Sequence, residues 1–420
     1  TDGGAAGVLR QYLDELLRAY ALMNRPARPP VLYAGNRELI GELQVKADEV
    51  GFRLLAADNV RPTLHTEYLA DAQQKLASLY SEKKAQNTAG IAEIIRWTER
   101  GVQPTAHGFG RMAQLLAGLY QGDVLAVDLG SMATTVAASL GGQQYLNVFA
   151  QLGIGHSASE VAGLIPPENI HRWLATVQVD ADETLNYLWN KSLFPQTLPA
   201  TPVEMELEYA AAREIVRHAV SSARHSWRNA PARGLLPHFD AILLGGTTLT
   251  STPNDGWSLL IALDALLPTG ITRVLLDPHG LAPALGLMAP LNAQAVVQAI
   301  DAGAFYDLGY VISVSGRARN GEVVLTGTLK PAGGAATPFE AVYGSILALP
   351  LEYGQTAELT LEPRRGSIGE GGPRRKLTVT GGALGVVIDA RGRPWRFPRD
   401  ADERRERLRE WQQSLAQEEA

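Results

Sequence analysis

Apolar and polar positions in the first part of the chain follow helical and strand periods in turn. From residue 7 to 23 apolar side chains recur every three or four positions, which predicts an amphipathic helix. A short buried strand over 31–36, a helix over 37–51 and a second strand over 52–60 are expected next. This order is typical of the crossover connection in a parallel sheet. Residues 67–120 are predicted to be mostly helical.

Three strand patterns then follow in close succession, at 123–129, 133–140 and 143–150. The connections between them are too short for helices, so they predict an antiparallel meander. A long helix with one apolar face is expected over 204–226, and a buried strand over 239–246. A helix, a strand and a second helix are predicted after it, at 256–267, 273–278 and 280–289.

The pattern changes after about residue 306. Short alternating strands separated by Gly and Pro turns replace the helices, which predicts a separate β-rich domain over 306–400. The last twenty residues carry ten charges and suit a charged helix over 401–420, with a solvated tail as the alternative.

Composition narrows the functional classes. The chain has 420 residues and a net charge of −6, so no overall basic field attracts nucleic acid or an anionic membrane. It has no cysteine, which excludes disulfides, thiolate metal sites and a cysteine nucleophile. The eight histidines show no metal-ligand spacing, so we expect them at caps or on the surface. No apolar run approaches the roughly 20 residues of a membrane span and no secretion signal opens the chain, so we expect a cytoplasmic protein.

The first candidate for chemistry is the stretch VLAVDLGSMATT, which begins at residue 124. A carboxylate at the end of the first meander strand can hold the water shell of Mg²⁺, and Asp128 has that position. The turn that follows can contact phosphate, because glycine lets the backbone approach and hydroxyl groups donate to phosphate oxygens. The residues predicted to do so are Gly130, Ser131, Thr134 and Thr135.

The second candidate is ILLGGTTLT, which begins at residue 242. Gly245, Gly246 and Thr247 follow a buried strand and precede a helix, an arrangement that lets a nucleoside approach the end of the strand. A meander, then helices, then a strand ending in Gly-Gly is the order expected in one lobe of an actin-like ATPase. The two stretches therefore predict one nucleotide cleft, although each alone also suits an ordinary turn.

Several stretches together resemble the family called GlmL or MutL, the accessory proteins of glutamate mutase, not the mismatch-repair protein that shares the second name. They include the opening TDGG, YAGN at 33–36, ADNVRPTL at 57–64, AVDLGSMATT, AQLGIGHSA at 150–158, LLGGTTLT and DALLPTGITRVLLDPHG. The resemblance covers roughly residues 1–300, and GGALGVVIDARGRP at 381–394 looks like the extension of some bacterial members.

The resemblance implies an α/β fold of the actin-like, or ribonuclease H-like, ATPase class. Its lobes would be the remainder of a first lobe over 1–120 and a second lobe with the phosphate hairpin over 121–305. Family members carry more of the first lobe upstream, so we expect an N-terminally truncated chain. We expect ATP hydrolysis only where that missing part is present.

The resemblance also implies a function. The protein would be an accessory or reactivating factor for an adenosylcobalamin-dependent glutamate (methylaspartate) mutase, with ATP and Mg²⁺ as cofactors and the mutase subunits as partners. ATP would drive the exchange of damaged cobalamin. The alternatives are a catalytically inactive scaffold that binds a partner protein through its β domain, and a small-molecule kinase. The kinase is disfavoured because no second acidic residue is placed to accept a substrate proton. A homo-oligomer is compatible with the sequence.

Overall fold

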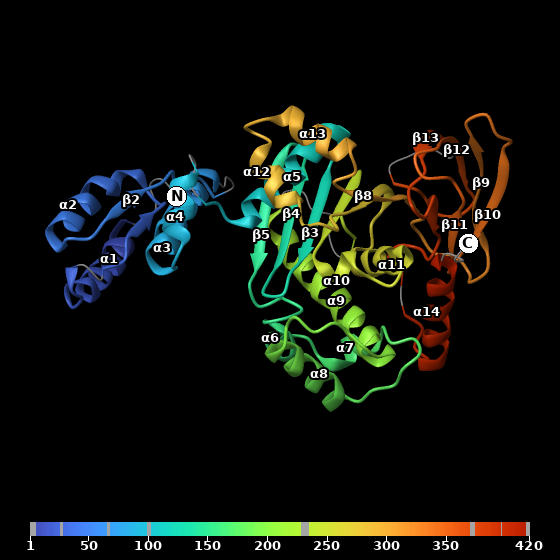
Figure 1. The fold of residues 1–420 in the computed structure, drawn as a ribbon, viewed down its shortest axis with the longest axis horizontal. Coiled ribbons are helices and arrows are strands. Elements are labelled where there is room, and N and C mark those ends of the chain that lie inside the picture. Colours follow the sequence, from blue (N-terminus) through green and yellow to red (C-terminus); the bar gives the residue numbers. More distant parts are fainter. Residues whose placement is uncertain are drawn as a thin grey trace. The chain divides into compact units, whose positions relative to one another are not determined.

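The computed structural model describes residues 6–25, 28–64, 68–98, 102–227, 235–369, 374–395 and 397–416. The chain divides into two compact units, Thr1–Pro104 and Thr105–Ala420 (Figure 1). Among the described residues, no helix combines the length and the apolar character that crossing a membrane requires.

The first unit is built around a small parallel strand pair. Strand β1 (Val31–Tyr33) pairs in parallel with β2 (Leu54–Ala56), and α2 (Ile40–Val50) connects them, so the predicted crossover is confirmed. Helix α2 ends where Gly51 takes a φ of 81°, a conformation that glycine adopts without strain. The unit also holds α1 (Ala6–Ala21), α3 (Ala70–Asn87) and α4 (Ile91–Trp97).

The second unit is organised by an eight-stranded sheet in the order β11-β14-β8-β7-β6-β3-β4-β5. Strands β3 (Val124–Leu129), β4 (Thr134–Leu140) and β5 (Gln143–Phe149) pair antiparallel, which confirms the predicted meander. Strand β6 (Ala241–Gly245) lies parallel to β3, and β7 (Gly270–Leu276) lies parallel to β6. The carboxyl ends of β3, β6 and β7 therefore meet at one edge of the sheet.

Helices cover both faces of this sheet (Figure 1). One face packs on α9 (Pro202–Ala223) and α11 (Asp255–Leu266) through residues such as Val127 and Leu244. The other face packs on α5 (Thr105–Tyr120) and α12 (Ala282–Met288) through residues such as Ala126 and Leu243. The shorter helices of the unit are α6 (Ala158–Leu164), α7 (Pro167–His171), α8 (Ala181–Leu193), α10 (Thr247–Thr250) and α13 (Ala293–Asp301).

The part of the chain after residue 306 differs from the separate domain that the sequence suggests. Strands β8 (Tyr306–Ser313), β11 (Ile346–Leu349) and β14 (Val386–Asp389) belong to the large sheet, because β8 hydrogen-bonds along the outer edge of β7. Four other strands form a sheet of their own, in the order β10 (Thr337–Val342), β9 (Val323–Pro331), β12 (Thr356–Pro363) and β13 (Arg375–Thr380). The boundary expected at residue 306 thus falls inside one continuous sheet.

The C-terminal helix is also integrated into the second unit. Helix α14 (Ala401–Leu415) has the charged sequence expected of it, yet Leu408, Trp411 and Leu415 are buried against the main core. Helix α11, apolar on nearly its whole surface, needs cover on several sides. Helix α14 supplies part of that cover.

Candidate functional site

The two predicted glycine-containing strand ends lie side by side. Asp128 at the end of β3 is the register partner of Gly245 at the end of β6. A Cβ atom built on Gly245 lies 3.0 Å from Oδ1 of Asp128. Gly246 has a φ of 93°, and a Cβ there lies 2.1 Å from the carbonyl oxygen of Leu129. This close approach of the two backbones requires glycine.

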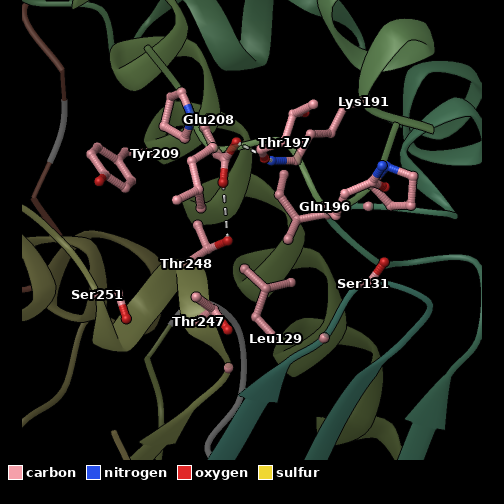
Figure 2. Close-up of a pocket in the computed structure, with 17 residues that line it drawn as sticks. Leu129, Ser131, Lys191, Gln196, Thr197, Glu208, Tyr209, Thr247, Thr248 and Ser251 are labelled. Carbon is pink, nitrogen blue, oxygen red and sulfur yellow. Dashed lines mark hydrogen bonds and ion pairs between the residues drawn. The ribbon is translucent and has the colours of Figure 1, made fainter. Parts of the chain in front are cut away.

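A cavity of about 460 Å³ opens beside these strand ends (Figure 2). Its volume lies in the range typical of small-molecule sites. Four of the residues predicted for nucleotide binding line it, namely Gly130, Ser131, Gly246 and Thr247. Helix α9 and the segment 195–199 form other parts of its wall.

The other four predicted residues do not line this cavity. Thr134 is fully buried, and its Oγ1 donates to the carbonyl oxygen of Leu152 at 2.5 Å. Gly245 lies behind the turn, in the buried strand. Because side chains alternate along a strand, Asp128 and its register partner Thr135 face the α5 side of the sheet, opposite to Leu129.

The Asp128 carboxyl has a second carboxylate near it. Burial, together with the negative charge of Asp277, raises the pKa of Asp128 to about 6. Asp277 follows β7 and accepts the backbone N–H groups of Leu281 and Ala282, each at 2.8 Å. Two carboxyl groups thus approach each other on the α5 side of the strand ends.

A buried ion pair forms the charged wall of the cavity (Figure 2). Nζ of Lys191 on α8 lies 2.7 Å from Oε2 of Glu208 on α9, and the two side chains are 6% and 5% exposed. Glu208 also accepts hydrogen bonds from the hydroxyl groups of Tyr187 and Thr248. Burial, followed by the charge of Glu208, raises the pKa of Tyr209 to about 12. The charged groups of the wall therefore already have hydrogen-bond or ion-pair partners within the protein.

The turn after β3 is held by a second loop. The N–H of Gly130 donates to the carbonyl oxygen of Ala133 at 2.9 Å and closes the turn. Residues 154–157 bind its outer side, with backbone N–H groups donating to the carbonyl oxygens of Gly130 and Ser131. Among the described residues, the N–H groups of Ser131 and Met132 have no acceptor. Two free N–H donors on a fixed turn suit an anion.

Comparison with known proteins then decides the family. A family model described as "MutL protein" matches residues 1–302. The chain belongs to the MutL family. This is the GlmL-type family, linked to an accessory function for glutamate mutase and distinct from the mismatch-repair protein.

Other comparisons add little to the MutL assignment. No curated protein matches the chain. A nucleotide-free structure of acetone carboxylase, from work on ATP-dependent acetone carboxylation, matches with 11% identity and a TM-score of 0.31. The match covers 78% of this chain and 60% of that one. The fold itself is mixed α/β with large sheets.

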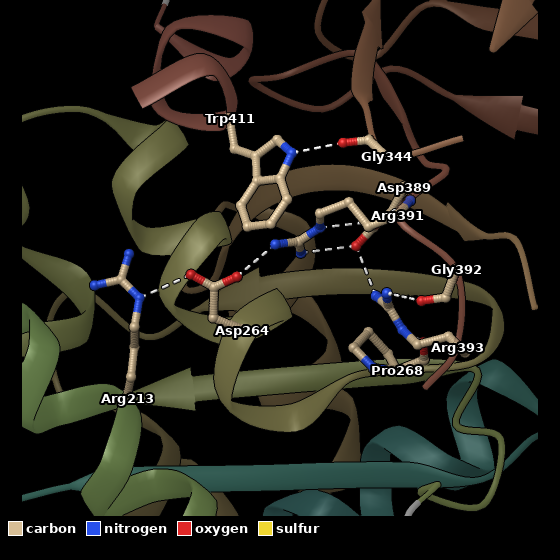
Figure 3. A network of polar contacts seen from close by, with 9 residues as sticks. All are labelled: Arg213, Asp264, Pro268, Gly344, Asp389, Arg391, Gly392, Arg393 and Trp411. Atoms are coloured by element: carbon tan, nitrogen blue, oxygen red, sulfur yellow. Dashed lines mark hydrogen bonds and ion pairs between the residues drawn. The ribbon is translucent and has the colours of Figure 1, made fainter. Parts of the chain in front are cut away.

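A second group of buried charges joins the MutL-matched part of the chain to the residues after it (Figure 3). Asp264 on α11 binds Nε of Arg213 at 2.8 Å and Nη1 of Arg391 at 2.6 Å. Asp389 at the end of β14 binds Arg391 at 2.9 Å and Arg393 at 2.6 Å. None of these five residues lines the cavity.

Sequence reasoning missed several residues at or near the cavity, among them His156, Lys191, Glu208, Tyr209 and Asp277. A signal existed for Glu208 and Tyr209, because they lie in the predicted helix over 204–226 next to its apolar positions. Lys191 comes four residues after Tyr187, one helical turn away. No such local pattern indicated that α8 and α9 meet at Glu208.

Proposed function

We propose that this chain is an accessory or reactivating factor for an adenosylcobalamin-dependent glutamate (methylaspartate) mutase, and that it binds ATP in the cavity beside β3 and β6. One observation carries the proposal: in a MutL-family chain, the turns at Gly130–Ser131 and Gly246–Thr247 converge on a single cavity. The actin-like ATPase class is part of the same proposal. It is supported by the sheet order β5-β4-β3-β6-β7 with helices on both faces.

The donors present fit a nucleotide. The free N–H groups of Ser131 and Met132 would hold a phosphate group, and Gly246 and Thr247 would border the nucleoside. Mg²⁺ prefers oxygen ligands and keeps most of its waters, so Asp128, which faces the α5 side of the strand ends and not the cavity, would reach the ion only through water. The cation would also relieve the repulsion between Asp128 and Asp277. In this assignment Thr134 and Thr135 support the turn from the strand and do not touch phosphate.

The role of ATP is a matter of linkage. A nucleotide changes the affinity of the protein for the mutase only if it binds the two conformations with different affinity. The ATP-bound and ADP-bound forms of the protein would then bind the mutase with different affinity. Damaged cofactor would leave the mutase in one of these states, and intact adenosylcobalamin would bind in the other.

The experiment has two parts. The full chain is melted with and without Mg-ATP, where ligand at 100 times its Kd adds about 2.7 kcal/mol to stability. Glutamate mutase loaded with hydroxocobalamin is then incubated with the protein, ATP and adenosylcobalamin, and mutase activity is followed. We expect stabilisation by ATP and ATP-dependent recovery of activity. Stabilisation without recovery contradicts the accessory role, and absence of both favours the inactive scaffold.

A further inference from the structure

Ser131 and His156 form a hydroxyl–imidazole pair at the edge of the cavity. Oγ of Ser131 lies 2.9 Å from Nδ1 of His156. The same Oγ accepts the backbone N–H of His156 at 3.0 Å. A serine hydroxyl has one proton to donate, and Nδ1 is the acceptor within reach of it. In the tautomer that carries its proton on Nε2, Nδ1 of His156 accepts the hydroxyl proton of Ser131 in a hydrogen bond.

The pair is fixed by the loop that carries His156. The N–H groups of Gly155 and Ser157 both donate to the carbonyl oxygen of Ser131, at 3.0 and 3.2 Å. A Cβ atom on Gly155 would lie 2.1 Å from Oγ of Ser131, so only glycine leaves room for the hydroxyl. Oγ of Ser157 adds a hydrogen bond to the carbonyl oxygen of Met132 at 2.8 Å. Backbone contacts on both sides thus hold serine and histidine within reach of each other.

Ser131 also lines the cavity, while His156 is exposed and does not line it. A nucleophile that lines a ligand cavity and contacts a base is the arrangement used for covalent catalysis by serine. The N–H group of Ser131 is one of the two free donors on the turn. A phosphate bound there would lie next to the Ser131 hydroxyl.

We propose that Ser131 is a phosphoryl acceptor and His156 its general base, an inference that rests on the proposed binding of ATP. Oγ of Ser131 attacks the γ-phosphorus of the bound nucleoside triphosphate. The bond from that phosphorus to the β,γ-bridging oxygen breaks, and the nucleoside diphosphate leaves with the electron pair. The hydroxyl proton passes to Nδ1 of His156. The products are phosphoserine, an imidazolium and the diphosphate.

The modified turn would differ strongly from the free one. Phosphoserine carries a charge of about −1.5 to −2 near neutral pH, placed beside the new imidazolium. That charge would occupy the anion position of the turn and compete with the phosphates of a second nucleotide. Phosphorylated Ser131 would therefore prevent a second nucleotide from binding, and one cycle of nucleotide binding would end there.

The test uses the full chain, Mg²⁺ and ATP labelled on its γ-phosphate. We expect one phosphoryl group, located at Ser131 by peptide mass spectrometry, and none in Ser131→Ala. His156→Gln keeps a hydrogen-bond acceptor but takes no proton, so labelling should slow by about 10²-fold or more. Ser159→Ala, an exposed serine three residues from His156, is the matched control and should label at the normal rate.

Thermal melting with a non-hydrolysable ATP analogue separates this inference from the proposed function. Stabilisation by the analogue without phosphate on Ser131 overturns the inference and leaves ATP binding intact. Label on another residue, or normal labelling in His156→Gln, overturns it as well. Absence of any stabilisation overturns both proposals. The unfolding temperature of Ser131→Ala without nucleotide, compared with that of Ser159→Ala, distinguishes a lost acceptor from a misfolded turn.

Discussion

Two regions of the second unit bury opposite charges in different ways. In the cavity wall, one lysine faces one glutamate whose remaining partners are hydroxyl groups, and open space lies alongside. At the junction with the C-terminal segment, three arginines enclose two aspartates, with every side chain at most 3% exposed (Figure 3). The charged groups of the first region border a cavity and can still bind a ligand. The charged groups of the second region bind only one another and their protein neighbours, which indicates a structural role.

The pKa values within the buried network of Arg213, Asp264, Asp389, Arg391 and Arg393 support this distinction. Burial alone would raise the pKa of Asp389, but the charges and hydrogen bonds of Arg391 and Arg393 hold it well below its usual range. The opposite charges of Asp389 and Asp264 likewise raise the pKa of Arg391 above its usual value despite burial. Trp411 packs against the same guanidinium, 4.7 Å from the ring centroid, and donates to the carbonyl oxygen of Gly344. Each charge is thus fixed by several neighbours.

The largest expected effect comes from opening this network. Arg391→Met keeps much of the volume but leaves Asp264 without its 2.6 Å partner and Asp389 with one guanidinium. Removing one partner of a buried charge group typically costs about 3–5 kcal/mol, because the remaining charge stays buried. We expect a loss of that size in the free energy of unfolding, measured by urea denaturation.

An exposed ion pair provides the control for that measurement. Arg374 contacts Glu362 at 3.1 Å, but its side chain is 71% exposed. Arg374→Ala should cost less than about 1 kcal/mol, as exposed pairs do. Equal losses in the two variants would show that burial of the network contributes nothing special, and the contrast between the two regions would lose its basis.

The next effect concerns the backbone at the cavity. Gly246→Ala places a Cβ atom 2.1 Å from the carbonyl oxygen of Leu129 at a φ of 93°. The combined clash and strain should cost about 2–4 kcal/mol and remove stabilisation by Mg-ATP. The control is Gly280→Ala, where φ is 63° but no atom lies within 4 Å. Only strain of about 1–2 kcal/mol is expected there, with the ATP effect retained.

A third prediction concerns pH. The folded-state pKa of Asp128, about 6, lies above its value of 3.8 in an unfolded chain. Protonation therefore favours folding, and that contribution is lost as pH rises from about 4 to above 6. Asp128→Asn removes the penalty, so the variant should be more stable than wild type above about pH 7, by up to about 3 kcal/mol at roughly 1.4 kcal/mol per pKa unit.

The same variant separates stability from binding. Below about pH 3 the stability difference between the wild type and Asp128→Asn should be smallest, because the Asp128 carboxyl of the wild type is then protonated in both the folded and the unfolded chain. At neutral pH Asp128→Asn should gain stability but lose the Mg²⁺-dependent part of ATP binding. Thermal melting across pH, with and without Mg-ATP, checks both. An unchanged response to Mg-ATP would remove Asp128 from the proposed cation site.

Local patterns were enough to predict the strands beside the cavity and the long helix α9, although not α8, which carries Lys191. The meander at 123–150 and the glycine pair after β6 follow from short connections and strand ends, which are local properties. The juxtaposition of Asp128 and Gly245 followed from the order of parallel strands. Side chains alternate along β3, so Asp128 faces one side of the sheet and Leu129 faces the other. This alternation decides which residues line the cavity.

Long-range pairing was not predictable in the same way. Apolar and polar residues alternate after residue 306 as they do in the strands of any sheet. No local pattern predicts that β8 pairs with β7. The charged residues of α14 suggested a solvated helix, since Leu408, Trp411 and Leu415 are few among them. Their burial depends on α11, which lies far earlier in the chain. Contacts of this kind appear only once the fold is assembled.

The smallest expected effect tests the cavity wall itself. Lys191→Met leaves Glu208 without its cation, yet the hydroxyl groups of Tyr187 and Thr248 still donate to it. Water in the adjoining cavity can also reach this carboxylate, so we expect a loss of about 1–3 kcal/mol, below that of Arg391→Met. Urea denaturation of the two variants measures both losses. A loss as large as that of Arg391→Met would mean that the cavity wall is closed, like the network at the C-terminal junction.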